Sequence, residues 1–303
     1  MAAILGIGNA TLDIVHTVDG YPEENDEMRC ISRSIQRGGN IANTLVVLSQ
    51  FGHRCSWAGV LVDNSDGRLI LDDLKLHGIN TGTCRMQISG SVPVSSVLLN
   101  INTGSRTIVH YRDLPEYSSA DFESIDLRSF DWLHFEGRNV DELQVMMQRA
   151  REHCPSIPRS LEVEKPHAGI ENLFCLADVL LFSRDYGCHY AYGNPRDLLQ
   201  TIHAQHPDAD LFCTRGEQGA IALDKTGRIY SQTAVAPHQV VDTLGAGDTF
   251  NAAVINGCLA KLETASVLRQ ACVLAGRKCS QTGLDGLVND RLLGMIDASA
   301  SHD

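Results

Sequence analysis

The stretch VVDTLGAGDTFNAAV, residues 240–254, passes from an apolar run through small residues to an aspartate where a helical pattern begins. Gly245, Ala246 and Gly247 carry little or no side chain, so a ligand can approach the backbone closely. The first amides of a helix lack intrahelical partners and lie at the positive end of the helix dipole. The pattern therefore predicts an anion hole suited to phosphate.

Asp248 follows this turn directly. We expect the field of the helix N-terminus to hold its carboxylate ionised, where it can take a proton from a hydroxyl group that attacks phosphorus. The alternative is that Asp248 only caps the helix.

The turn is not the common phosphate loop, because the chain has no G-x-x-x-x-G-K-[ST] string.

The second motif is RGGNIANT, residues 37–44. Its two glycines, Gly38 and Gly39, allow the backbone to approach a ligand, and Asn40 and Asn43 lie three apart on one face of the helix that follows. Asparagine amides donate and accept hydrogen bonds, which suits sugar hydroxyls. A Gly-Gly turn with an asparagine cap is the alternative.

Three further signals are weaker. Asp13, in GNATLD, can accept hydrogen bonds from two neighbouring hydroxyls, but an isolated turn residue looks the same. FCTRGEQGA, residues 212–220, is a strand-end turn whose backbone could line a nucleotide, or a plain turn. Arg106, in a predicted hairpin, could reach a phosphate or lie solvated at the surface.

The second half of the chain alternates strand and helix. DWLHFEG, RSLEVEKP, DVLLFS and DLFCTRG are strand-like, and VDELQVMMQRAREH, GIENLFCLA and NPRDLLQTIHAQH are helical between them. This rhythm predicts an α/β fold with a parallel sheet covered by helices on both faces. We also predict one buried strand over CSWAGVLV and a helix over SDGRLILDDLKLHGI, with Ser65 as its cap.

The strands at 12–18, 29–36 and 92–111 fall outside that alternation. We expect them to form a separate small sheet that serves as a lid or an interface. VSSVLL, within this set, carries apolar residues on both faces, more than one covering sheet can bury. The pattern predicts a homodimer in which the lid sheets pack together.

Composition restricts the function classes. The 303 residues are 43% hydrophobic and carry a net charge of −12, which argues against a nucleic-acid surface because phosphate binding needs clustered Lys and Arg. The ten cysteines include no C-x-x-C pair and are expected to be reduced. No signal segment or membrane-length apolar run is recognised, so we expect a single cytoplasmic domain over residues 1–303 with no membrane partner.

RGGNIANTLVVLSQFG and DTLGAGDTF resemble the two signatures of the ribokinase-like carbohydrate kinases, the phosphofructokinase-B family, and TRGEQGA resembles its nucleotide turn. The resemblance runs from residue 3 to about 288. It implies a three-layer domain with a central, mostly parallel sheet and a small β-sheet lid. It also implies ATP and Mg²⁺ as cofactors, and K⁺ as an activator in many members. YPEENDEMRC, SRTIVHYRDLP, EVEKP and GRKCSQTGLDG are most similar to the members that phosphorylate ketohexoses such as fructose, at the 1-hydroxyl.

The resemblance also implies a role for each matching residue. Asp248 is the catalytic base, and the amides of Gly245, Ala246 and Gly247 form the anion hole. The residues implied to hold the sugar are Asp13, Gly39, Asn40 and Asn43. Those implied to contact ATP are Arg106, Gly216, Glu217, Gln218 and Gly219, with Cys279 near the adenine.

Two departures from the family pattern are visible. The N-x-x-E motif that often serves magnesium is replaced by SRDY, residues 183–186, so direct metal ligands stay unassigned and Glu162 and Glu164 are candidates for contact through water. Ketohexose kinases tend to carry an acid and an asparagine where this chain has Asn25 and Ser105.

The function indicated is that of an ATP-dependent sugar kinase. Within the family, the alternatives are a ribokinase and an adenosine or other nucleoside kinase. Outside it, a nicotinamide dehydrogenase is supported only by GIGNAT, residues 6–11, which lacks the third glycine of the dinucleotide fingerprint. A non-catalytic sugar-binding protein is the third alternative, and it would not need Asp248.

Overall fold

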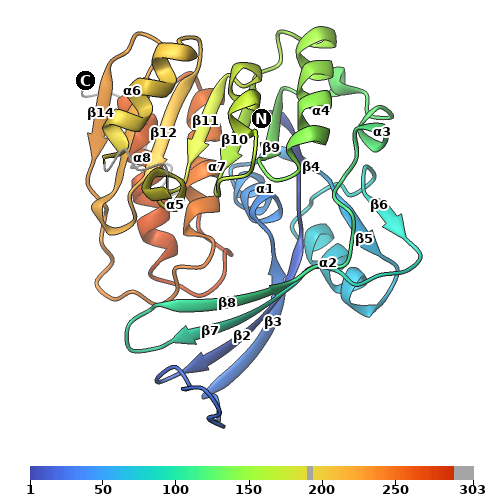
Figure 1. Cartoon of the computed structure of the whole chain (residues 1–303), viewed down its shortest axis with the longest axis vertical. Helices are drawn as coiled ribbons and strands as arrows, with labels where there is room; N and C mark the ends of the chain where they lie inside the picture. Colours follow the sequence, from blue (N-terminus) through green and yellow to red (C-terminus); the bar gives the residue numbers. More distant parts are fainter. Residues whose placement is uncertain (190–193, 290–303) are drawn as a thin grey trace.

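The computed structural model describes residues 1–189 and 194–289 (Figure 1). Within them, an eight-stranded central sheet has six parallel strands and two antiparallel strands at one edge. In spatial order its strands are β14 (Ile229–Gln232), β13 (Ala220–Leu223), β12 (Asp210–Thr214), β11 (Val179–Phe182), β10 (Arg159–Val163), β9 (Trp132–Glu136), β1 (Ala3–Ile7) and β4 (Arg54–Ala58). The predicted parallel sheet is confirmed, with an antiparallel edge formed by β13 and β14.

Helices cover both faces of this sheet (Figure 1). The helices are α1 (Asn40–Gln50), α2 (Ser65–Leu76), α3 (Ser119–Phe122), α4 (Val140–His153), α5 (Arg184–His189), α6 (Pro195–Gln205), α7 (Ala246–Leu259) and α8 (Thr264–Lys278). The described residues also form three short 3₁₀ helices, η1 (Leu127–Ser129), η2 (Ile170–Leu176) and η3 (Gly216–Gln218). Neighbouring residues of β1 illustrate the layering, because Gly6 faces Ile41 of α1 whereas Ile7 lies beside Leu143 and Met146 of α4.

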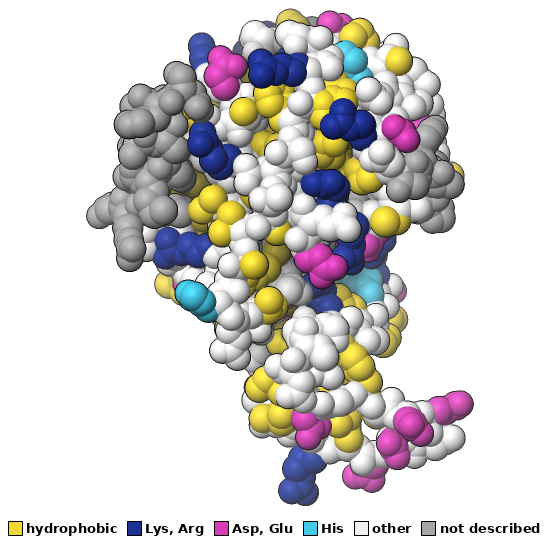
Figure 2. All heavy atoms as spheres, turned by 90° about the vertical axis from the view of Figure 1, so that its left-hand side faces the viewer, with side chains coloured by type: hydrophobic (Ala, Val, Ile, Leu, Met, Phe, Trp, Pro, Cys, Tyr) yellow, Lys and Arg dark blue, Asp and Glu magenta, His cyan; other side chains and the backbone are white. Residues whose placement is uncertain are grey.

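A four-stranded lid sheet projects from the body of the molecule (Figure 1). Its strands in spatial order are β3 (Ser32–Gly38), β2 (Thr11–Val18), β7 (Val94–Asn100) and β8 (Arg106–Tyr111). Apolar side chains gather over the lid in the surface view of Figure 2. Val109 is 70% exposed and Tyr111 is 57% exposed, so the lid carries apolar surface that this chain does not bury. The separate small sheet predicted from the sequence is confirmed.

Two local predictions were wrong. CSWAGVLV is not one strand: β4 ends before Gly59, and β5 (Val60–Val62) leaves the central sheet to pair with β6 (Arg85–Gln87). A Cβ on Gly59 would lie 2.5 Å from the Gly8 carbonyl oxygen, so a side chain does not fit at the point where the chain leaves the central sheet. The cap of α2 is Asn64 rather than Ser65, since the Asn64 side chain accepts the Gly67 N–H at 2.9 Å.

Among residues 1–189 and 194–289, every helix is too short or too polar to span a membrane.

Candidate active site

The carboxyl ends of the parallel strands bring acidic side chains to one edge of the sheet. Glu136 is the last residue of β9, and Glu162 lies near the end of the adjacent strand β10, paired in register with Glu136. Glu164 follows β10 directly. Ligands of open α/β sheets bind outside this edge, so the acids mark the candidate site.

Asp248 lies in the first turn of α7, and only 7% of the residue is exposed. The turn before it depends on Gly245, whose φ of 81° is left-handed. The Asp248 carboxylate accepts a 2.6 Å hydrogen bond from Asn43 Nδ2, and its backbone oxygen accepts one from Thr44 Oγ1 at 3.3 Å. These bonds join α7 to α1.

The charge state of Asp248 differs from the expectation drawn from the sequence. Burial raises its pKa to about 7, and Glu164 and Glu136 add to the rise. The Asn43 bond and the positive charge of Arg106 act in the opposite direction. The expectation that the helix N-terminus alone holds Asp248 ionised is therefore corrected, because loss of water outweighs the favourable contacts. A pKa near neutrality suits a group that accepts a proton.

Glu162 is a buried acid of the site, with 5% of the residue exposed. Its Oε1 accepts hydrogen bonds from Asn40 Nδ2 at 3.2 Å and Asn251 Nδ2 at 3.0 Å. Its Oε2 is buried and, within the described residues, has no hydrogen-bond partner. Burial raises the pKa of Glu162 well above its ordinary value, and the nearby carboxylates, of which Asp248 acts most strongly, raise it further. An unpaired buried carboxylate oxygen is available to a cation or an ordered water.

The RGGN motif packs closely against the first strand-to-lid connection. Gly39 precedes α1 with φ of 99°, and a Cβ there would lie 2.5 Å from the Asn9 carbonyl oxygen. Gly38 is equally confined, because a Cβ would meet an Asp13 carboxylate oxygen at 2.1 Å. Asp13 on lid strand β2 is thus brought against the RGGN turn, although the two motifs are separate in sequence.

The two asparagines of this motif face different partners. Asn40 donates to Glu162 and also to Glu164 Oε2 at 3.1 Å, whereas Asn43 donates to Asp248. Both lie on α1, as their spacing predicts. The predicted sugar-binding residues therefore border the acidic cluster.

Asp242 and Lys278 stabilise the turn that leads into the predicted anion hole. Asp242 Oδ1 accepts the Leu244 N–H at 2.8 Å, and Asp242 Oδ2 lies 2.6 Å from Lys278 Nζ in a fully buried ion pair. The first helical bond runs from Thr249 N–H to the Gly245 oxygen at 2.9 Å, so earlier amides precede the helical ladder. Ala246 N–H is already donated to Thr243 at 3.3 Å.

The predicted ATP residues lie on three separate elements. Arg106 reaches from the lid to the turn before the anion hole, where Nη1 donates to Thr243 Oγ1 at 2.6 Å. The stretch from Gly216 to Gly219 forms η3 and its end, between β12 and β13, at the same sheet edge as the acids. Cys279 is the C-cap of α8, and its backbone oxygen accepts the Val241 N–H at 2.8 Å.

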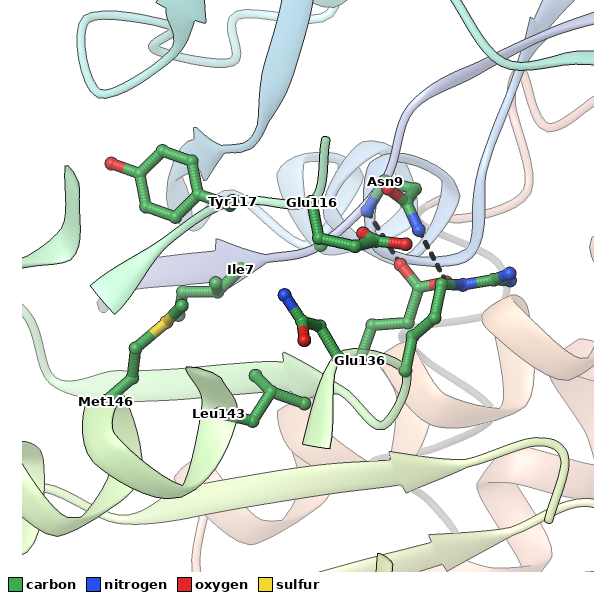
Figure 3. A pocket seen from close by; sticks show the side chains of 10 residues that line it. Ile7, Asn9, Glu116, Tyr117, Glu136, Leu143 and Met146 are labelled. Carbon is green, nitrogen blue, oxygen red and sulfur yellow. Dashed lines mark hydrogen bonds and ion pairs between the residues drawn. The ribbon is translucent and has the colours of Figure 1, made fainter. Parts of the chain in front are cut away.

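Sequence reasoning missed a polar cluster beside the site. Glu136 accepts the Asn9 backbone N–H at 2.7 Å and Arg138 Nε at 3.1 Å, and Arg112 Nη1 donates to Asn9 Oδ1 at 2.7 Å. Figure 3 shows Asn9, Glu116 and Glu136 lining a pocket at this point. The only signal was the position of FEGRN at the end of a buried strand.

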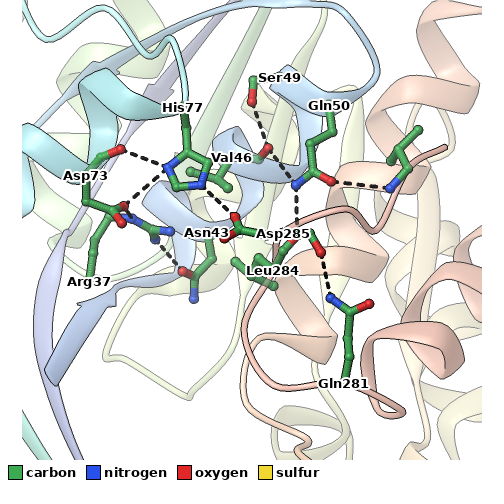
Figure 4. Close-up of polar contacts among 11 residues, drawn as sticks. Arg37, Asn43, Val46, Ser49, Gln50, Asp73, His77, Gln281, Leu284 and Asp285 are labelled. Carbon is green, nitrogen blue, oxygen red and sulfur yellow. Dashed lines mark hydrogen bonds and ion pairs between the residues drawn. The ribbon is translucent and has the colours of Figure 1, made fainter. Parts of the chain in front are cut away.

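Sequence reasoning also missed a group of polar residues that contacts the Asn43 oxygen, on the side of the amide away from Asp248. Arg37 Nη1 donates to Asn43 Oδ1 at 2.5 Å, and its Nε donates to Asp73 of α2 (Figure 4). His77 bonds both Asp73 and Asp285. Arg37 and Asp73 are 36 positions apart in the sequence, so no local pattern indicated that they are in contact.

GIGNAT does not form a dinucleotide site of the fingerprint type. Its last residue, Thr11, begins lid strand β2 (Thr11–Val18), where the fingerprint requires a helix whose N-terminus would bind a pyrophosphate.

The pfkB family carbohydrate kinase model matches residues 1–290. Ketohexokinase of Mus musculus is 39% identical over 293 residues, covering 94% of this chain and 98% of that protein. Ribokinase of Giardia lamblia has a TM-score of 0.83 at 16% identity, covering 99% of both chains. Arabidopsis thaliana ribokinase, solved with ribose and ATP, has a TM-score of 0.77 at 19% identity, covering 97% of this chain and 98% of that chain. The structural likenesses show the ribokinase-like fold.

Proposed function

The chain belongs to the pfkB family of carbohydrate kinases, and we propose that it transfers the γ-phosphoryl group of ATP to the 1-hydroxyl of a ketohexose such as fructose. The observation that carries the chemistry is the buried carboxylate of Asp248, bonded to Asn43 at 2.6 Å beside a glycine-bounded turn that opens a helix. The sugar class is supported by the 39% identity to ketohexokinase along nearly the whole chain.

In the proposed reaction, Asp248 accepts the hydroxyl proton as the sugar oxygen attacks the γ-phosphorus. The new phosphorus–oxygen bond forms as the bond to ADP breaks, leaving ADP, the sugar phosphate and a proton on Asp248. The amides of Gly245 and Gly247 precede the helical ladder and are proposed to donate to the phosphoryl oxygens, with Ala246 contributing once its bond to Thr243 is released. Such transfer depends mainly on positioning and electrostatics.

The sugar is proposed to lie between the lid and the RGGN turn. Asp13, Gly39, Asn40 and Asn43 meet there and offer both donors and acceptors. ATP is proposed to extend from Arg106 and the anion hole toward the turn at Gly216–Gly219, with Cys279 near the adenine.

Mg²⁺ fits the acidic cluster. Glu162 Oε2 is a buried oxygen without a partner among the described residues, and carboxylates are the ligands this hard cation prefers. No set of three or more acidic, His or Cys side chains in residues 1–189 and 194–289 is arranged to enclose a metal. Magnesium often binds with retained waters and substrate phosphates, so Glu162 and Glu164 are proposed to hold it through water. When bound, it would neutralise phosphate charge.

Three further statements stay predictions. Potassium activation follows from the family resemblance alone, and comparing activity in potassium and tetramethylammonium salts tests it. A cytoplasmic location stays an expectation. A homodimer through the lid is supported by the exposed apolar residues of β8.

The substrate is tested by measuring ADP formation with fructose, ribose and adenosine. We expect the highest kcat/KM with fructose. Preference for ribose or adenosine would assign the chain to another activity of the family. A folded protein that binds sugar yet forms no ADP with any of them would point to a sugar-binding protein.

A further inference from the structure

The amide of Asn43 is held in one orientation. A guanidinium only donates, so Arg37 Nη1, at 2.5 Å, fixes the carbonyl oxygen of Asn43 on its own side. The amino group must then point to the opposite side, where it donates to Asp248 Oδ2 at 2.6 Å. The orientation of the group that contacts Asp248 is thus decided by Arg37.

Arg37 is buried in turn and needs a partner. The residue is 8% exposed, and its Nε forms an ion pair with Asp73 of α2. A buried guanidinium without a counter-charge would be strongly unfavourable. Asp73 therefore fixes Arg37 at a point that Asn43 can reach.

Asp73 is secured by a second cation. His77 is the C-cap of α2, with Nδ1 2.8 Å from the Asp73 backbone oxygen and 3.5 Å from its carboxylate. His77 Nε2 lies 2.8 Å from Asp285 Oδ1. Carbonyl and carboxylate oxygens only accept hydrogen bonds, so both ring nitrogens carry protons and the ring is an imidazolium. The Asp73 bond raises the pKa of His77 to about 9, which agrees with this state.

We propose that Arg37 and Asp73 are positioning residues of the kinase: they orient Asn43 (Figure 4), and Asn43 orients the carboxylate of Asp248 toward the sugar hydroxyl. The inference rests on the proposed role of Asp248 as the base. Neither Arg37 nor Asp73 contacts Asp248 directly, so their effect passes through the Asn43 amide.

The test is Arg37→Ala, assayed for kcat with and without added guanidinium at millimolar concentration. Small misplacements of catalytic groups can cost about a hundredfold in rate, and we expect a loss of kcat of about ten- to a hundredfold. Added guanidinium should restore part of it by filling the vacated donor position. The matched control is Arg68→Ala, which removes an exposed guanidinium paired with Asp63 at 2.9 Å and should leave kcat unchanged and insensitive to guanidinium.

A double variant tests the route. If Arg37 acts through Asn43, then Arg37→Ala combined with Asn43→Ala should have the kcat of Asn43→Ala alone, within about threefold. Multiplied losses, absence of guanidinium rescue in a folded Arg37→Ala protein, or a normal kcat would each overturn the proposal.

If Arg37→Ala does not fold, Asp73→Asn provides a second test of the proposal. It should lower kcat while thermal unfolding remains cooperative, and an unchanged kcat would overturn the proposal. If the proposed function itself is wrong, the turnover of the variants should follow a different pattern. In that case Asp248→Asn itself retains turnover, whereas failure of this inference alone leaves Asp248→Asn inactive and Arg37→Ala normal.

Discussion

The side chains of Asn43 and Asp248 lie 2.6 Å apart, although 205 positions separate the two residues in the chain. The bond joins the first turn of α7 to the helix that follows the RGGN turn. One motif therefore supplies the candidate base and the other supplies the group that orients it. This relationship makes the two motifs a single chemical unit.

Replacing Asp248 by Asn distinguishes a role as catalytic base from a role as helix cap. The amide keeps the size of the carboxylate and can still accept the Asn43 bond, so the free energy of unfolding should change by no more than about 1 kcal/mol. The amide cannot take up a proton, and turnover should fall at least about a hundredfold. ATP and sugar should still bind, as calorimetry can measure. A folded variant with turnover within a few-fold of the parent would rule out the base.

The pKa of about 7 for Asp248 predicts a pH dependence. Only the ionised carboxylate accepts a proton, so kcat/KM should fall about tenfold per pH unit below that pKa and level off above it. Circular dichroism over the same range would separate this limb from unfolding. A flat profile between about pH 5.5 and 8 in the folded enzyme would contradict the assignment.

Asn43→Ala should affect sugar and turnover more than ATP. Removing the amide leaves sugar hydroxyls and Asp248 without a donor, at a cost of about 1–3 kcal/mol. The KM for sugar should rise and kcat should fall, while the KM for ATP barely changes. Asn102→Ala, which removes an exposed lid amide bonded to the Asp19 backbone, is the control. Equal losses for both substrates would indicate a structural role.

Arg106→Ala should weaken ATP binding and slow transfer. The guanidinium reaches Thr243, just before the anion hole, and can bridge phosphate oxygens from the lid. Steady-state kinetics should show a raised KM for ATP and a reduced kcat. Arg33→Ala removes another exposed arginine of the lid and should have no effect. Unchanged kinetics for Arg106→Ala would indicate that Arg106 is only a solvated surface residue.

A charged residue on the outer strand of the lid should prevent the proposed dimer. Val109 of β8 is 70% exposed in the single chain, and Val109→Lys would place a charge in the predicted interface. Sedimentation at micromolar concentration should show a dimer for the parent and a monomer for the variant. Val145→Lys, at a 50% exposed position on α4, should remain dimeric. A parent that sediments only as a monomer would contradict the interface.

The sequence predicts the layers because each rests on a local pattern. Helical and strand periodicities alternate after residue 130, and the lid strands break that rhythm. The strand over CSWAGVLV fails because both halves are buried and apolar, so periodicity cannot detect the turn at Gly59. Asn64 and Ser65 are both good cap residues, and only the backbone conformation selects between them.

The site is predicted where residues share a motif and missed where only tertiary contact unites them. Asn40, Asn43 and Asp248 lie in short strings with visible chemistry. Arg37, Asp73 and His77 become a group only because α2 packs beside the RGGN turn. The raised pKa of Asp248 likewise depends on burial, which no local pattern measures.

The placement of β1 has a consequence for how the protein is made. Residues 3–7 lie inside the sheet and pair with residues 54–58 on one edge and residues 132–135 on the other. During synthesis the second edge stays open until β9 leaves the ribosome, and an unpaired apolar strand edge invites association with other chains. Prematurely ended chains would lack Asp248 and, if they stop before β9, would also expose that edge. One edge of β1 is therefore paired only after residue 132 has been made, so we expect incomplete chains that end before β9 to associate with one another more readily than longer ones.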